Sequence, residues 1–231
     1  MEKTRREQKR EDTANEIKTV ARRLMTEGGT TALSLRPIAA EMKMSVMAIY
    51  RYFENRDALL TALITDNFNA LADALEAARD GEPGDAAKKL LAVLEAYRQW
   101  AMDHPVDFQL IYGNPIPGYD APDEITVPAV VRSFAVTVGL IEEMLQQQLA
   151  APPPPYDIVP PNTLANIEMV IERDGYPVSP LAMYLGMVGW GQLHGIIMLE
   201  LFNHIQAIVG DGAAHYTAQM HNLMIVMGAK L

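Results

Sequence analysis

The feature that most constrains this chain is the segment of residues 34–57, whose pattern predicts two short helices joined by a tight turn. Ser34 can cap the first helix and Ser45 the second, because a serine oxygen accepts a hydrogen bond from a free backbone N–H at a helix start. In the second helix Ile49 and Phe53 are four residues apart, so both side chains point to one face and pack inward. The segment is therefore predicted to be a helix-turn-helix whose second helix keeps its other face exposed.

The exposed face of the second helix combines apolar, small and aromatic side chains with one cation. These side chains are Val46, Met47, Ala48, Tyr50 and Arg51. A helix of this kind can enter the major groove of DNA. Helix pairs with a short turn also occur in every helical bundle, so spacing alone leaves both interpretations open.

The residue types in this segment narrow the interpretation. The motifs that matter are Ile38-Ala39-Ala40, Met44-Ser45, Ile49-Tyr50-Arg51-Tyr52-Phe53 and Asn55-Arg56-Asp57-Ala58-Leu59. Over roughly residues 14–60 the sequence resembles the N-terminal domain of TetR/AcrR-family transcriptional regulators. Trp190 to Gly195 resembles the Trp-His-Gly motif of one group of C-terminal domains in that family. With His104-Pro105 and the Pro/Gly-rich loop after Tyr112, this motif extends the resemblance to most of the chain.

The resemblance implies roles for the residues of the helix-turn-helix. Val46, Met47 and Ala48 would face base edges in the major groove, where apolar side chains can pack against thymine methyl groups. Tyr50 and Tyr52 would contact phosphates. Arg36 would reach a base such as guanine, and Arg56 would meet a phosphate from the start of the following helix. The predicted DNA-binding residues are Arg36, Ser45, Val46, Met47, Ala48, Tyr50, Arg51, Tyr52 and Arg56.

Two positions depart from the family pattern. Lys43 occupies the turn position where glycine is usual, and a left-handed backbone there would cost a lysine about 1 kcal/mol. Ala48 stands where a hydroxyl residue is common, which removes one polar contact to DNA.

The charge of the chain is unevenly distributed. The net charge is −10, from 19 basic and 29 acidic residues. Residues 1–60 hold twelve of the basic and nine of the acidic residues, a net of +3, which leaves seven and twenty for the rest, a net of −13. Basic charge is therefore concentrated where DNA is expected to bind, and the acidic remainder should repel the duplex.

Other features argue against an enzyme. The chain has no cysteine, which excludes disulfides, thiolate catalysis and cysteine-ligated zinc. Its five histidines, at positions 104, 194, 204, 215 and 221, lack the spacing of a zinc site, and no phosphate loop or Gly-x-Ser-x-Gly motif is present. We predict no catalytic residue, metal or cofactor. The charged opening stretch has no apolar core of a secretory signal, so we expect a cytoplasmic protein.

The apolar periodicity predicts an all-α chain of about nine or ten helices, without strands. The predicted DNA-binding domain covers residues 1–60, with a flexible basic arm at 1–12 and a first helix opened by the capping-box pair Thr13 and Glu16. A linking helix over about residues 55–80 leads into a ligand-binding and dimerisation domain at 61–231. The run from Leu181 to Phe202 is long enough to span a membrane, but Gln192, His194 and Glu200 interrupt it, so we interpret it as a core helix and predict no membrane contact.

Two further sets of residues are predicted in the second domain. The ligand-binding set, chosen for aromatic and methionine side chains with few polar groups, is Tyr97, Trp100, Met102, Phe108, Tyr112, Met144, Met183, Met187, Trp190 and His194. The dimerisation set, a stripe at helical spacing, is Tyr216, Met220, Leu223, Met224 and Met227. Residues of either set can instead be internal core.

Together these expectations describe a homodimeric repressor that a small, largely apolar molecule releases from a palindromic double-stranded DNA operator. The competing hypothesis is a helical small-molecule-binding or adaptor protein without sequence-specific DNA binding. An enzyme is the least favoured class.

Overall fold

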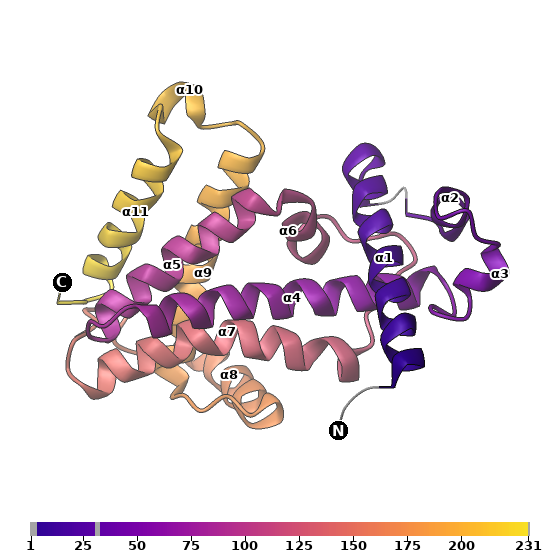
Figure 1. Ribbon diagram of the computed structural model, residues 1–231. Helices are drawn as coiled ribbons and strands as arrows, with labels where there is room; N and C mark the ends of the chain where they lie inside the picture. Colours follow the sequence, from indigo (N-terminus) through magenta and orange to yellow (C-terminus); the bar gives the residue numbers. More distant parts are fainter. Residues whose placement is uncertain (1–3, 31–32, 231) are drawn as a thin grey trace. The chain divides into compact units, whose positions relative to one another are not determined.

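The computed structural model describes residues 4–30 and 33–230, and within these ranges it contains eleven helices and no strand, only an isolated bridge between Ala150 and Ala229. The all-α prediction is confirmed. The number exceeds the predicted nine or ten because the four-residue helix α10 forms separately after α9. The helices are α1 (Arg5–Gly28), α2 (Leu35–Glu41), α3 (Val46–Ile49), α4 (Arg56–Gly81), α5 (Ala86–Asp103), α6 (Pro105–Tyr112), α7 (Asp123–Gln146), α8 (Pro161–Asp174), α9 (Pro180–Leu201), α10 (Gln206–Val209) and α11 (Gly212–Val226), as Figure 1 shows.

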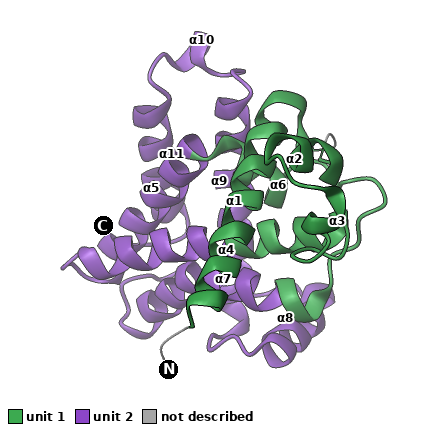
Figure 2. Cartoon of the chain, turned by 45° about the vertical axis from the view of Figure 1, so that its right-hand side comes forward, with its two compact units in different colours: residues 1–67, 104–126 green, residues 68–103, 127–231 purple. Residues whose placement is uncertain are grey.

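The chain forms two compact units (Figure 2). Unit 1 consists of residues 1–67 and 104–126, and unit 2 of residues 68–103 and 127–231. The division falls inside α4, and unit 1 also includes α6 and the loop after it, which the predicted boundary at residue 60 assigned to the second domain. The reason is a polar network within unit 1, in which the Arg22 guanidinium donates to the Asp107 carboxylate of α6 and to the Asn67 side-chain oxygen of α4, both at 2.9 Å.

In unit 1 the predicted helix-turn-helix forms, but its second helix, α3, ends at Ile49 and does not reach Phe53. Ile38 and Ile49 are fully buried, and Phe53, at the end of the motif, is buried as well. The turn closes α2 with a pair of backbone hydrogen bonds, from Lys43 to the Ala40 carbonyl at 3.2 Å and from Met44 to the Ala39 carbonyl at 2.9 Å. These two hydrogen bonds satisfy carbonyls that a helix end leaves unpaired. The pattern requires a left-handed residue at the position of Lys43.

Helix α1 begins earlier than the sequence pattern predicts. Residues 5–12, predicted as a flexible arm, are helical, while the first three residues of that arm lie outside the described residues. The capping box uses Thr4 and Glu7 instead of Thr13 and Glu16, and the Thr13 hydroxyl instead donates to the Lys9 carbonyl at 2.9 Å inside the helix. The prediction failed because two capping-box patterns occur nine residues apart, and only the second precedes an apolar run.

Unit 2 is organised around α9, which contacts α5, α8 and α11. Gly186 allows a close approach of α9 to α7, since a Cβ there would lie 2.5 Å from Cγ1 of Val138. The Arg98 guanidinium of α5 forms a two-pronged ion pair with the Glu200 carboxylate of α9, with both side chains about nine-tenths buried. In the described residues, α7 and α9 are long and apolar enough to cross a membrane, a test that the core helices of soluble proteins also pass.

Candidate DNA interface and ligand cavity

An open groove runs along the helix-turn-helix in unit 1. Its lining is Ser34, Leu35, Arg36, Val46, Met47, Tyr50, Asn55 and Arg56. Met47 is 72% exposed and Tyr50 is 46% exposed, although both lie on the helix that buries Ile49. The structure thus brings five of the predicted DNA-binding residues together on one exposed surface.

Local hydrogen bonds hold this groove in shape. The Ser45 hydroxyl accepts from the Ala48 N–H at 3.1 Å and the Asn55 side chain accepts from the Ala58 N–H at 2.7 Å, so both caps form. Ser34, by contrast, makes no side-chain capping bond, which corrects the prediction for α2. The Arg56 Nε donates to the Leu33 carbonyl at 3.0 Å and thereby fixes the guanidinium at the edge of the groove.

Of the remaining predicted DNA-binding residues, Ser45 caps the start of α3, and the other three lie near its end or after it. Ala48 is half-buried, and Arg51 and Tyr52 line a second open groove together with the start of α1. This second groove, called here the α1 basic groove, is lined by Thr4, Arg6, Glu7, Lys9, Arg10, Arg51 and Tyr52. Sequence reasoning assigned the tyrosine and the arginine to DNA but did not expect the first helix to lie beside them.

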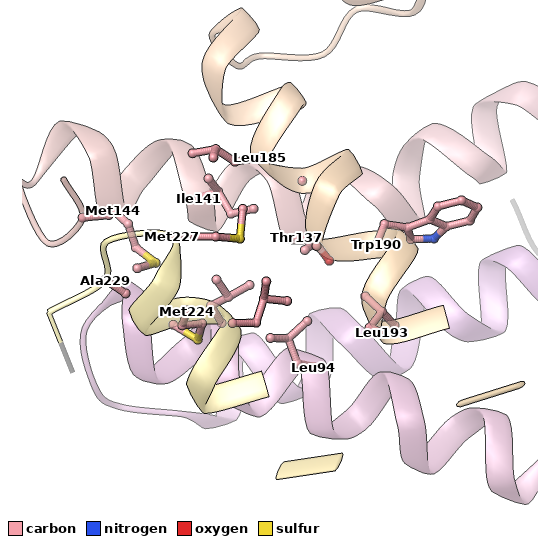
Figure 3. A pocket seen from close by; sticks show the side chains of 15 residues that line it. Leu94, Thr137, Ile141, Met144, Leu185, Trp190, Leu193, Met224, Met227 and Ala229 are labelled. Atoms are coloured by element: carbon pink, nitrogen blue, oxygen red, sulfur yellow. The ribbon is translucent and has the colours of Figure 1, made fainter. Parts of the chain in front are cut away.

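Unit 2 contains a narrow, almost wholly apolar cavity of about 50 Å³ that is partly open to solvent. Its walls come from α5, α7, α9, α11 and the C-terminal segment after α11. In Figure 3 Met144 and Ala229 lie toward one end of the cavity and Trp190 toward the other. The lining is Leu90, Leu94, Thr137, Ile141, Met144, Ala150, Leu185, Gly186, Gly189, Trp190, Leu193, Leu223, Met224, Met227 and Ala229.

Of the ten predicted ligand-binding residues, only Met144 and Trp190 line this cavity. Phe108 and Tyr112 belong to α6 in unit 1, where their rings lie 5.2 Å apart. Tyr97 and Trp100 are buried in α5, Met183 is buried in a cluster with Ile167 and Tyr176, Met187 is 47% exposed and Met102 is half-buried. Residue chemistry alone does not select the residues that line a cavity, because helical phase decides which side chains reach a given space.

His194 lies beside the cavity without lining it. The Tyr97 hydroxyl and the His194 Nε2 are 2.6 Å apart, and the His194 ring lies 4.2 Å from the Trp190 ring. Burial lowers the pKa of His194 to about 4, so the imidazole is neutral at pH 7 and its Nε2 can accept from the tyrosine. The histidine therefore positions the indole at one end of the cavity.

The predicted dimerisation stripe packs inside the chain. Tyr216, Met220, Leu223 and Met224 are each less than a tenth exposed, and the Tyr216 hydroxyl donates to the Leu94 carbonyl at 2.8 Å. Met227 lines the cavity, as do two of the others. A buried side chain cannot also contact a second subunit, so Tyr216, Met220, Leu223 and Met224 are core, the alternative that the sequence left open, while Met227 is half-buried.

Most of the cavity was missed because leucines, glycines and alanines carry no distinctive chemistry. The spacing of Leu185, Gly189 and Leu193 along α9 was the available signal, since residues four apart share a face. Gly189, the one small residue in that row, makes room that a leucine would fill. Among the described residues, no cluster of three His, Asp or Glu side chains is arranged to hold a metal ion.

Comparisons with known proteins cover both units. The family model described as bacterial regulatory proteins, tetR family, matches residues 17–63, and the model described as tetracyclin repressor-like, C-terminal domain, matches residues 90–223. The HTH-type transcriptional regulator Rv1816 of Mycobacterium tuberculosis is 30% identical over 227 residues, which cover 96% of this chain and 95% of the relative. The HTH-type transcriptional regulator Mb1846 of Mycobacterium bovis gives the same values.

Solved structures also resemble this chain over nearly its whole length. The crystal structure of the regulatory protein SCO4313 matches with a TM-score of 0.77 and 32% identity, and covers 96% of this chain and 99% of that one. The complex of RolR with resorcinol matches with a TM-score of 0.56 at 18% identity over 96% of this chain and 91% of that one, a likeness of fold alone.

Proposed function

Because the chain belongs to the TetR family of transcriptional regulators, we propose that it acts as a homodimeric repressor that a small molecule releases from a palindromic operator. Family membership makes it a regulator rather than an enzyme. Repression, dimerisation, ligand response and a cytoplasmic location are the parts of the proposal that experiments must test.

The observation that carries the proposal is the exposed groove over the helix-turn-helix. Met47 and Tyr50 keep large apolar surfaces in water, an arrangement that gains nothing for folding. In the major groove, Met47 and Val46 would pack against thymine methyl groups, while Arg36 would reach a base edge. Tyr50 and Arg56 would donate hydrogen bonds to phosphates and orient the helix.

One such helix reads too few bases to be selective, so we place two subunits on half-sites about 34–36 Å apart. The surface proposed for dimerisation is the outer face of α9, where Met187, Gly191, Gly195 and Leu199 recur every fourth residue and are all exposed. The two glycines would let a second helix approach closely. On α11, the exposed Ile225 and Val226 would extend the contact.

We test this surface with Leu199→Glu, which places a charge in the proposed contact and should convert a dimer into a monomer. Met169→Glu on α8 is the matched control, because Met169 is also about half exposed but lies on another helix. Sedimentation equilibrium reads the oligomeric state. A Leu199→Glu variant that stays dimeric would exclude this face.

The cavity in unit 2 is the proposed effector site. Its nearly apolar walls favour an uncharged, largely apolar compound. RolR, which has this fold, binds resorcinol in its crystal structure. We propose that the effector favours a spacing of the two recognition helices that no longer fits successive major grooves. Linkage then requires that operator DNA weaken effector binding by the same factor.

The decisive experiment is selection of a preferred duplex from a random pool, followed by a gel shift with that duplex and with the upstream region of the protein's own gene. Sequence-specific binding supports the repressor, and uniform weak binding supports the alternative of a helical ligand-binding or adaptor protein. The same gel shift, repeated with a panel of uncharged phenols and alkyl alcohols that raise the melting temperature, tests the ligand response. Equal operator affinities with and without a bound compound would remove the allosteric part.

A further inference from the structure

The first turns of α1 form a helix that buries none of its own side chains. Every residue from Thr4 to Asp12 is exposed, and the first buried residue of α1 is Ile17. A short helix without a buried face is marginal in water, because its backbone ordering is not offset by packing. Here the Thr4 and Glu7 capping box and a 3.0 Å hydrogen bond from Gln8 to Asp12 hold it. The segment is thus specified as a helix, although it contributes no buried side chain to the core of unit 1.

One face of this helical extension is basic and is part of a groove. Arg6, Lys9 and Arg10 are three and four residues apart, so they share a face, and all three line the α1 basic groove. The opposite wall is Arg51 and Tyr52, which directly follow the recognition helix. The Arg10 guanidinium donates to the Arg51 carbonyl at 3.4 Å and joins the two walls.

The charge in this groove is largely uncompensated. Four cations, Arg6, Lys9, Arg10 and Arg51, line it with a single carboxylate, Glu7. That carboxylate already accepts hydrogen bonds from the Thr4 N–H at 2.8 Å and the Thr4 hydroxyl at 2.9 Å. Among the residues that the structure describes, no ion pair involves any of the four cations. A row of unpaired cations on a rigid wall is complementary to a polyanion.

Resting on the proposed DNA binding, we propose that the α1 basic groove is a second site for the DNA backbone, separate from the groove over the recognition helix. Arg6, Lys9 and Arg10 spread over about 6 Å of helix, enough to meet two successive phosphates of one strand. Tyr52 and Arg51 extend the same row of donors toward α3. Phosphate contacts of this kind raise affinity without reading bases.

The test compares variants of the full-length chain on the duplex that the wild-type protein selects from a random pool, with fluorescence anisotropy as the readout over a range of NaCl concentrations. Arg6→Gln/Lys9→Gln removes two groove cations and keeps side chains of similar length. Lys88→Gln/Lys89→Gln removes the same charge from unit 2, and Arg5→Gln removes a cation from the same turn that does not line the groove. Circular dichroism checks that the helix content is unchanged.

We expect the groove variant to bind at least about 10-fold more weakly, with the slope of log affinity against log salt reduced by about one for each phosphate that the variant no longer neutralises. Its ranking of operator sequences should match that of the wild type, and Arg6→Lys/Lys9→Arg should restore both affinity and slope. The two control variants should stay within about twofold of the wild type.

Two outcomes would overturn the proposal in distinguishable ways. If the groove variant keeps wild-type affinity and slope while Tyr50→Ala loses binding, the DNA-backbone site is wrong and the repressor stands. If the wild-type protein selects no sequence at all, the proposed repressor and this second site fail together.

Discussion

The groove over the helix-turn-helix and the cavity in unit 2 are built in opposite ways. The groove exposes large side chains, such as Met47 at 72%, on a helix of four residues held by a serine cap. The cavity is lined by buried leucine and methionine side chains from four long helices. Leu94, for example, is 5% exposed and Met224 is 4% exposed. The comparison separates residues whose packing stabilises the fold from exposed residues that contribute little to its stability.

This difference predicts a division of mutational effects. The exposed side chains in the groove, such as Met47 and Tyr50, can change with little loss of stability, because they give up little packing when they are truncated. Side chains around the cavity cannot, because each one supports several helices. Partner recognition and stability should therefore be affected by separate sets of residues.

The largest expected effect is on operator binding. Arg36→Ala/Tyr50→Ala should weaken binding by at least about 100-fold, because each contact contributes about 1–3 kcal/mol and a dimer makes each one twice. Anisotropy with the selected duplex measures the affinity, and urea unfolding should show a change below about 0.5 kcal/mol. A large loss of stability would mean that the groove is part of the core after all.

The reverse effect is expected at the cavity. Leu94→Ala should lower the free energy of unfolding by about 3 kcal/mol, since it removes buried apolar contacts and enlarges an existing void. The folded fraction should bind the operator like the wild type in the absence of effector. Urea unfolding followed by circular dichroism measures the loss, with Met47→Ala as the matched exposed control. A cost below about 0.5 kcal/mol would indicate that the surrounding helices collapse into the space.

A smaller effect concerns pH. Because burial lowers the pKa of His194 to about 4, the unfolded chain, with an ordinary pKa near 6.5, binds more protons than the folded one between these values. The histidine therefore leaves the free energy of unfolding unchanged at high pH. It lowers that free energy progressively as the pH falls below about 6.5. From pH 7.5 to 5.5 the wild type should lose about 1 kcal/mol more than His194→Gln, measured by urea unfolding at both values. Equal losses in the two proteins would contradict the buried neutral imidazole.

The two regions also differ in how far the sequence predicts them. The helix-turn-helix is local, since Ser45, Ile49 and Asn55 act within one turn of their own positions, and its outer face follows from helical spacing. The exposed Met47 and Tyr50 were therefore predictable, whereas the helical start of α1 was not, because no apolar spacing marks it.

The cavity depends on contacts between distant segments. Whether Met144 or Met183 reaches it is decided by how α7 and α9 rotate against each other, and Gly186 influences that rotation through its close approach to Val138. The stripe on α11 shows the same limit, since the buried Tyr216 and the exposed Ile225 lie on the same apolar helix. Sequence periodicity identifies a face but not the neighbour that covers it.

The smallest predicted effect lies in the turn between the two short helices. There the backbone needs a left-handed residue, but the sequence supplies a lysine in place of a glycine. Lys43 has a φ of 53°, the left-handed conformation expected if this position ends α2 as glycine usually does. Its side chain is exposed and makes no ion pair with a described residue, so only the backbone strain should change in Lys43→Gly. Thermal and urea unfolding should show a gain of up to about 1 kcal/mol, because glycine adopts this conformation without a steric penalty. Lys88→Gly, within helix α5, is the matched control and should lose about as much. If Lys43→Gly were destabilising, the lysine would have to contribute more to the folded unit 1 than its exposed position suggests, and the clean separation between recognition surface and core would no longer hold at this turn.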